Sequence, residues 1–502
     1  MLVPISFSMQ SLNIETIAPI LVTIAGGLFI LIMDLFKKDL NKSLYVVISL
    51  LFLIMSFGFL IDLSFFFAAN GTFTGFFNLV VVDGISLIAQ FIIVGASLLF
   101  VPLALSSKRF HEFSYSEFFA LFLFMIAGFQ IMVSTDNLIL IFLGLESASL
   151  ALYTLIALHN RSKSFEAAVK YFTMGAVAAG LYVFGAMVLY AITGSVEIHQ
   201  IASILVANHY VNLAYVLIGI VFLFAALAFK VAIIPFHTWA PDVYEGASAS
   251  MAGYMSIVPK IAGFVVMMRL FEFLVHSGLP WIEVILYASV VITMTASNIW
   301  ALVQTDVKRM LAYSSISHAG FVLSAILIGT TQANTALFLY WILFTFTNLG
   351  AFSMLWISRQ KNLDKWKSSD HPYEKFSGMI HTSPVAAVIM GIFMLSLAGV
   401  PPFALFWGKM YMISSAVTSG FTVLAVIMVL NSAIAAFYYL KLIVYMFMKE
   451  PVSNVHGRIY TMNTSKALST VIGVAAIVTI FAILVVNPLL EIITSFVYNS
   501  GF

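Results

Sequence analysis

The sequence has 502 residues, of which 62% are hydrophobic and 9% are charged, with a formal net charge of +2 and no cysteine. The apolar share excludes an ordinary soluble domain and indicates an all-α polytopic membrane protein, while the near-neutral charge gives no indication of a nucleic-acid partner. Without cysteine the chain cannot hold a disulfide, a thiolate-ligated iron–sulfur cluster or covalently attached c-type haem, and no GxGxxG or GxxxxGK[ST] nucleotide motif is present.

About fourteen apolar stretches are candidates to cross a bilayer core of roughly 30 Å as helices. In chain order they are residues 15–36, 43–66, 83–105, 116–133, 136–158, 165–193, 212–234, 251–274, 281–302, 308–329, 334–357, 380–402, 421–447 and 467–491. The seventh and twelfth continue past prolines, to about residues 250 and 419. No basic segment precedes the first stretch, which predicts an uncleaved anchor.

Basic residues predict the orientation, because lysine and arginine accumulate in cytoplasmic loops. Seventeen of the 23 basic residues fall in alternate loops. They are Lys37, Lys38, Lys42, Lys108, Arg109, Arg161, Lys163, Lys308, Arg309, Arg359, Lys361, Lys365, Lys367, Lys375, Lys449, Arg458 and Lys466. The opposite loops have none, so both termini are expected outside.

The two interrupted stretches predict an internal repeat. Residues 212–250 and 380–419 would each be roughly 60 Å long as straight helices, twice the bilayer core, so each must break or run sideways. Spans 4–8 and 9–13 would then be two five-helix units, each with its fourth helix broken, and an odd number of helices inverts the second unit. Broken helices in inverted repeats indicate a substrate path near mid-membrane.

The expected organisation follows from this repeat. It comprises helices 1–3 in residues 1–110, the first repeat in 111–275, the second in 276–450 and helix 14 in 451–502.

Ionisable residues inside the spans form a predicted polar line across the membrane. Glu146 lies near the middle of span 5, Lys230 just before Pro235 in span 7, and Lys260 in span 8. In the second unit, the counterpart of Glu146 is His318 in span 10, and the counterpart of Lys230 is Lys409 in span 12. A charge at the centre of a membrane helix costs roughly 2.5–3.5 kcal/mol, so these positions indicate function. An apolar environment weakens the hold of a lysine on its proton and a nearby carboxylate restores it, so a movable Glu146–Lys230 pair could hold and release a proton.

Structural explanations are the alternatives at each position. Glu146 could support a helix–helix contact, and His237 or His318 could satisfy a backbone carbonyl. Lys170, close to the inner surface, and Lys441 could snorkel to the headgroups.

Charged groups nearer the span ends have similar alternatives. Arg269 could snorkel or pair with Glu272 one turn later. Asp242 and Glu245 are expected to cap or solvate the connection between spans 7 and 8.

The stretch KVAIIPFHTWAPDVYEGA at residues 230–247, with Glu146 upstream and Lys260 downstream, resembles the antiporter-like membrane subunits of respiratory complex I. The resemblance covers spans 4–13. Lysine at 409 argues against the M-type subunits, which have a glutamate on the broken twelfth helix. The single span after residue 450 argues against the longer L-type. The family's usual Gly-Phe-Phe-Gly-Lys begins with Leu405 here, which predicts a stiffer break.

The resemblance implies one proton-translocating unit in a membrane arm, driven by quinone reduction elsewhere. It assigns Glu146 and Lys230 as the coupling pair, Lys260 as the central relay and Lys409 as the outlet, connected through water by His237 and His318, with Lys170 matching a further family lysine. It places NADH, flavin, iron–sulfur clusters and quinone in partner subunits and none in this chain. Expected partners are M-type and K-type membrane subunits and the peripheral redox arm, in a bacterial inner membrane with both termini periplasmic.

Two other functions remain open. A subunit of a multi-subunit cation/proton antiporter would resemble the same motifs, although a sodium site should add carboxylates to Glu146. A structural membrane subunit without transport would leave five ionisable residues at mid-membrane unexplained.

Overall fold

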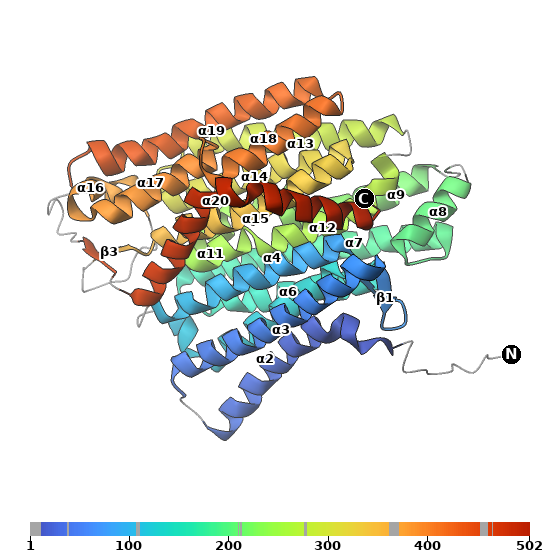
Figure 1. Cartoon of the computed structure of the whole chain (residues 1–502), viewed down its shortest axis with the longest axis horizontal. Helices are drawn as coiled ribbons and strands as arrows, with labels where there is room; N and C mark the ends of the chain where they lie inside the picture. Colours follow the sequence, from blue (N-terminus) through green and yellow to red (C-terminus); the bar gives the residue numbers. More distant parts are fainter. Residues whose placement is uncertain are drawn as a thin grey trace.

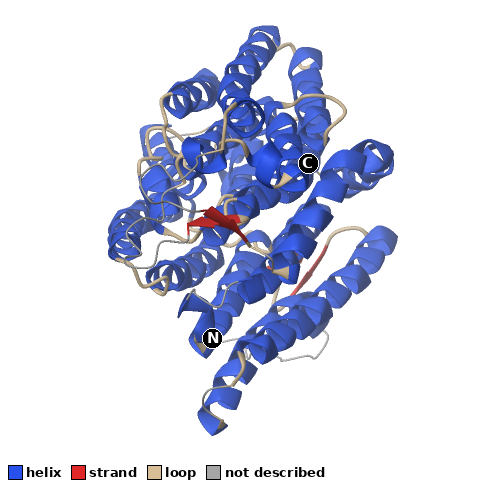
Figure 2. Ribbon diagram, turned by 90° about the vertical axis from the view of Figure 1, so that its left-hand side faces the viewer, coloured by secondary structure: helices blue, strands red, loops and turns tan. Residues whose placement is uncertain are grey.

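The computed structural model describes residues 12–37, 40–106, 111–208, 210, 213–275, 279–360, 371–451, 460–463 and 465–501. The described chain is a bundle of helices with two short two-stranded antiparallel sheets (Figure 2). In the first half the elements are α2 (Ala18–Phe36), α3 (Lys42–Asn70), β1 (Phe73–Gly75), β2 (Val80–Val82), α4 (Gly84–Phe100), α5 (Ser116–Val133), α6 (Leu138–Ala157), α7 (Ser162–Thr193), α8 (Ile198–Ala207), α9 (Leu213–Val231), α10 (Trp239–Gly246), α11 (Ala249–Met255) and α12 (Val258–Val275). In the second half they are α13 (Pro280–Leu302), α14 (Val307–Ile328), α15 (Thr331–Met354), β3 (Ser358–Gln360), α16 (Met379–Thr382), α17 (Pro384–Ala398), α18 (Ala404–Thr418), α19 (Thr422–Met448), β4 (Tyr460–Met462) and α20 (Lys466–Asn499).

The predicted all-α membrane architecture is confirmed. Thirteen segments of the described chain are long and apolar enough to cross a membrane. The remaining predicted span, the twelfth, is divided into α17 and α18, each of 15 residues and too short to cross alone. Both predicted breaks are present, at residues 232–238 between α9 and α10 and at 399–403 between α17 and α18.

The two five-helix units pack in corresponding ways. The first helix of each unit packs on the second, as α5 on α6 and α13 on α14. The third packs on the broken fourth, as α7 on α9 and α15 on α18. In Figure 1, α2 and α3 lie at one edge of the bundle and α19 at the opposite edge. The last helix, α20, packs against both α4 and α15, and so connects the N-terminal helices to the second unit.

Burial separates inner helices from peripheral ones. The most apolar window of Ala249–Glu272 is 100% buried and that of Val307–Ile328 is 94% buried, whereas that of Ser162–Thr193 is 28% buried. The inner helices α12 and α14 therefore contact protein rather than lipid, which is where polar side chains are tolerated in a membrane protein.

Several features were not predicted. Span 8 is interrupted at Ser256 and Ile257, between α11 and α12. Pro259, two residues after Ile257, has no backbone N–H with which to continue the hydrogen bonds of α11. The short helix α8 precedes α9, and the strands β1–β2 and β3–β4 pair outside the helices. Seven residues used to predict orientation lie outside the described part of the chain: Lys38, Lys108, Arg109, Lys361, Lys365, Lys367 and Arg458.

Candidate functional site

The break after α9 holds Lys230 at the end of a helix, in its last turn. Ala232 adopts a left-handed conformation with φ of 62°, which turns the chain away from the helix axis. The Trp239 indole donates to the Phe229 carbonyl at 2.8 Å, and Thr293 of α13 accepts from the Ile234 amide at 3.1 Å. The carbonyl beside Lys230 is therefore occupied by the indole, and the second unit anchors the break.

Glu146 and Lys230 line one small chamber between α6, α7 and α9, but they form no direct ion pair. Lys230 is buried and donates from Nζ to Ser149 Oγ at 2.8 Å. Ser149 in turn donates to the Leu145 carbonyl at 2.5 Å, which directs its lone pairs towards the ammonium. The Lys230 Nζ also lies 5.2 Å from the centre of the Phe129 ring, a cation–π contact. The expected pair is therefore open in this structure, with the serine holding the lysine.

Lys260 lies one turn beyond the interruption between α11 and α12 and is 1% exposed. Its Nζ donates to the carbonyl and to Oγ of Ser315 on α14, at 2.7 and 2.6 Å. Serine gives this lysine two acceptors without a counter-charge. A cation in such a position is held less firmly than in a salt bridge, which suits a group that must exchange a proton.

His318 follows Ser315 by one turn on the same inner helix and is 4% exposed. Its two ring nitrogens contact tyrosine hydroxyls: Nδ1 that of Tyr340, and Nε2 that of Tyr439 at 3.0 Å. The Tyr439 hydroxyl also contacts that of Ser314. This unbroken set of hydroxyl and imidazole groups can pass a proton by exchanging donor and acceptor roles. Sequence reasoning had not identified the tyrosines, because tyrosine in an apolar helix is not distinctive.

Lys409 reaches back across the break between α17 and α18. Its Nζ donates to the Leu397 and Ala398 carbonyls, both at 3.1 Å, where α17 ends. Unpaired carbonyls at a helix C-terminus carry partial negative charge and stabilise a cation. Gly399, with φ of 87°, leaves room for the side chain, because a Cβ there would lie 2.8 Å from Lys409 Cδ. Leu405 is buried in the first turn of α18, and its amide donates to Ser396 Oγ of α17 at 3.3 Å.

The other two predicted site residues lie apart from this series. His237 is buried in the first break and stacks on Trp300, with ring centres 5.0 Å apart and an interplanar angle of 6°. Lys170 lies at the rim of the bundle, with ion pairs to Glu166 at 2.7 Å and Asp242 at 3.0 Å. Its side chain is 43% exposed, so the structure places it outside the interior series.

A cluster of ion pairs connects the two units at this rim. Glu245 pairs with Lys163 at 3.1 Å and with Arg309 at 2.5 Å, and Arg309 also pairs with Asp242 at 3.1 Å. Glu245 lies outside the candidate spans. Although burial opposes its ionisation, the hydrogen bonds from Arg309 and Lys163 hold its pKa below the usual value. Asp242 and Glu245 were expected to cap or solvate the connection between spans 7 and 8. In the structure their ion pairs connect α10 to α7 and α14.

Two basic residues differ from their sequence-based interpretation, and a third has defined contacts. Lys308, counted as a loop residue, is buried in the first turn of α14 and donates to the Glu245 and Ala247 carbonyls. Arg269 is not a snorkelling residue, because its side chain is 5% exposed and pairs with Asp83 of α4 at 2.8 Å. Lys441 donates to the Gln304 carbonyl at 3.2 Å, with its Nζ 4.5 Å from the Tyr373 ring centre.

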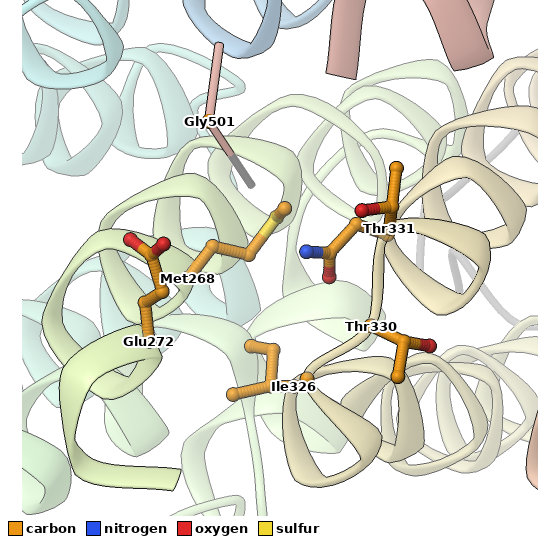
Figure 3. Close-up of a pocket in the computed structure, with 8 residues that line it drawn as sticks. Met268, Glu272, Ile326, Thr330, Thr331 and Gly501 are labelled. Carbon is orange, nitrogen blue, oxygen red and sulfur yellow. The ribbon is translucent and has the colours of Figure 1, made fainter. Parts of the chain in front are cut away.

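A polar cavity of about 430 Å³ lies at the far end of α14 from the rim cluster (Figure 3). Ile326 and Thr330, near the end of α14, face Met268 and Glu272 of α12 across it. The rim cluster and this cavity are separated by most of α14, roughly 30 Å at 1.5 Å per residue. Ser315 and His318 lie between them, so one inner helix connects polar openings at both ends of the bundle.

Comparison with known proteins identifies close relatives of this arrangement. Residues 135–435 match the family described as "NADH:quinone oxidoreductase/Mrp antiporter, TM". The chain is 69% identical, over 502 residues and 100% of both chains, to a protein of Sulfurimonas denitrificans named NADH-quinone oxidoreductase subunit N. It is similar to a chain of respiratory complex I from Thermus thermophilus, with a TM-score of 0.75 and 27% identity, covering 94% of this chain and 99% of that one. A chain of the Mrp complex from Dietzia sp. gives a TM-score of 0.83 at 19% identity, covering 97% and 98%, and so shares the fold.

Proposed function

The chain belongs to the NADH:quinone oxidoreductase/Mrp antiporter transmembrane family, and we propose that it is subunit N, a proton-translocating subunit in the membrane arm of an NADH–quinone oxidoreductase. It contributes to the enzyme as a translocase subunit, while electron transfer occurs in other chains. The full-length match to a protein of that name supports the assignment.

The observation that carries the proposal is the series of buried ionisable side chains in the membrane interior. Lys230, Lys260 and Lys409 are each at most 6% exposed, and His318 is 4% exposed. Three lysines at roughly 2.5–3.5 kcal/mol each would cost an amount comparable with the whole stability of an ordinary domain, about 5–15 kcal/mol. This cost indicates that the three lysines serve the function of the protein.

In the proposed path, protons pass between Glu146 and Lys230 in the first unit, through Lys260 and His318, to Lys409 in the second unit. Each lysine contacts neutral oxygens, of Ser149, Ser315 or the end of α17, and none of the three is locked in an ion pair. These contacts allow the ammonium to lose its proton when a neighbouring charge changes. His237 is a secondary relay at the first break, and Lys170 a supporting residue at the rim.

Partners and cofactors follow from the same assignment. NADH, flavin, iron–sulfur clusters and quinone belong to partner subunits, and M-type and K-type membrane subunits flank this chain. The enzyme lies in the bacterial inner membrane with both termini in the periplasm. The chain is divided into residues 1–110, 111–275, 276–450 and 451–502, with the two repeats as the central parts.

Copurification tests the assignment. A tagged chain extracted in a mild detergent should bring down peripheral subunits that carry flavin and iron–sulfur clusters. Recovery with further antiporter-like and small membrane subunits, but no redox subunit, would assign the chain to a cation/proton antiporter instead. If the complex is recovered but neither Lys230→Ala nor Lys260→Ala changes proton pumping, the chain would have only a structural role.

Orientation is tested separately. A cysteine-containing tag on either terminus should react with an impermeant maleimide in intact spheroplasts, because no native cysteine competes. Labelling only after the membrane is opened would reverse the topology.

A further inference from the structure

The chamber beside Glu146 and Lys230 contains a hydroxyl that the path described so far does not use. Glu146, Ser149 and Tyr153 are spaced three and four residues apart, so they lie on one face of α6. All three line the chamber, with Lys230 opposite. Side chains on a helix lean towards its N-terminus, which directs the Tyr153 ring back over Ser149 and towards Glu146.

The tyrosine hydroxyl has the Ser149 side chain as a hydrogen-bonding neighbour and can make a further hydrogen bond. Tyr153 is 8% exposed, and its ring packs edge-on against Tyr171 and Phe172, with ring centres 4.8 and 5.7 Å away. A phenolic hydroxyl can both donate and accept, and in native proteins the hydrogen-bonding capacity that protein atoms leave unused is usually taken up by water. The ring is thus fixed, while its polar end is left pointing into the chamber.

The chamber has the size for one ligand of water dimensions. The space available to the centre of a water molecule is about 10 Å³, close to the minimum that one water requires. A water there needs two to four polar partners, and Tyr153, Glu146 and Lys230 supply them. The remaining lining is apolar, from Ala178, Ala226 and other residues, which limits the site to one position.

Gly175 of α7 leaves the space that the Tyr153 hydroxyl occupies. A Cβ at this position would lie 2.0 Å from the Tyr153 hydroxyl oxygen and 2.9 Å from the ring carbon that carries it. Glycine inside a helix costs about 1 kcal/mol relative to alanine, and Gly175 has an ordinary helical backbone. The glycine is explained by the space that the tyrosine hydroxyl needs.

We propose that this chamber binds a single water molecule, positioned by the Tyr153 hydroxyl, which carries the proton between Lys230 and Glu146. The Lys230 ammonium gives a proton to the water while the water gives one of its own to the Glu146 carboxylate. The products are a neutral amine, a neutral carboxyl group and the same water, and the reverse transfer restores the charges. The pair can therefore exchange a proton without closing into a direct contact. Tyr153 is a positioning residue, and the inference rests on the proposed function.

The test uses the assembled enzyme in inverted membrane vesicles. Tyr153→Phe keeps the ring and removes the hydroxyl, and should lower proton pumping and coupled quinone reduction about five- to tenfold, the effect of one lost hydrogen bond. Tyr171→Phe is the matched control: this buried tyrosine packs on Tyr153, but its own hydroxyl has no partner and does not line the chamber, so pumping should be unchanged.

Gly175→Ala provides a second, independent arm. Alone it should impair pumping as much as Tyr153→Phe, because the new methyl group displaces the hydroxyl. When Gly175→Ala is combined with Tyr153→Phe, the further loss of pumping should be small, because the hydroxyl oxygen with which the new methyl group clashes is absent. Fully additive losses would indicate general damage to helix packing and overturn the proposal.

A high-resolution map of the assembled enzyme gives the direct measurement. One ordered water should lie within hydrogen-bond distance of the Tyr153 hydroxyl and be lost in Tyr153→Phe. A dry chamber, or normal pumping by Tyr153→Phe, would refute the bound water. If Glu146→Gln still impairs pumping in that case, the proposed function stands and only the water relay fails. If Glu146→Gln also pumps normally, the proposed function fails with it.

Discussion

Replacing Ser149 with alanine removes the only hydrogen-bond acceptor that the described structure gives to the Lys230 ammonium, 2.8 Å away. The change is mild for the helix itself, because alanine is the better helix former and the other contacts of the serine hydroxyl, with the Leu145 carbonyl and Tyr153, lie within the same helix. Any effect on transport should therefore come from the lysine.

The magnitude follows from the contact. A hydrogen bond to a charged group contributes about 1.5–3 kcal/mol. Its loss lowers the population of the open arrangement, relative to other positions of the Lys230 side chain, by roughly 10- to 150-fold. The competing position is a direct contact with Glu146, whose Coulomb attraction at 4 Å is roughly 4 kcal/mol at an effective dielectric constant near 20. We expect Ser149→Ala to close the pair, hold the proton on Lys230 and slow turnover about tenfold or more.

The assay is NADH-driven proton uptake by inverted vesicles, with quinone reductase turnover measured in parallel and assembly checked on a native gel. Ser149→Thr should preserve activity, because it retains the hydroxyl. Ser147→Ala, on the exposed side of the same helix, should behave as the wild type. The reasoning is refuted if the assembled Ser149→Ala enzyme pumps as fast as the Ser147→Ala enzyme.

Three further predictions concern the charged groups. Glu146→Gln should strongly impair pumping, whereas Glu146→Asp should retain part of it because a charge survives at a shifted distance; equal activity of both with wild type in vesicles would make the carboxylate structural. Lys409→Ala should lower pumping and quinone reduction together while ferricyanide reduction by the peripheral arm persists, and unchanged pumping would reduce this lysine to packing. Asp83→Asn removes the charge of the carboxylate that pairs with the buried Arg269, which should destabilise the protein by about 3–5 kcal/mol. A thermal unfolding midpoint in detergent equal to that of wild type would contradict the importance of that pair.

The sequence by itself determined the class and most of the spans, and it predicted the ionisable residues of the candidate site. Apolar stretches of about 20 residues are constrained by bilayer thickness, and charged side chains within them are rare enough to be recognised individually, so Lys230, Lys260 and Lys409 were identifiable without a structure. The two breaks were visible because proline removes a backbone donor and crowds the preceding turn, effects that depend on local chemistry. The interruption between α11 and α12 was missed, although Pro259, two residues after it, is a local signal that could have indicated it.

Only the tertiary structure decided which groups meet. Asp83 and Arg269 are 186 residues apart, and no local pattern pairs them. Ser315, Tyr340 and Tyr439 are not distinctive in their own helices and acquire a role only where α14, α15 and α19 come together around His318 and Lys260. The physical reason is that span positions follow from transfer free energies of single residues, which add along the chain. Hydrogen bonds depend instead on distances between helices, which side-chain packing fixes to within a few tenths of an ångström.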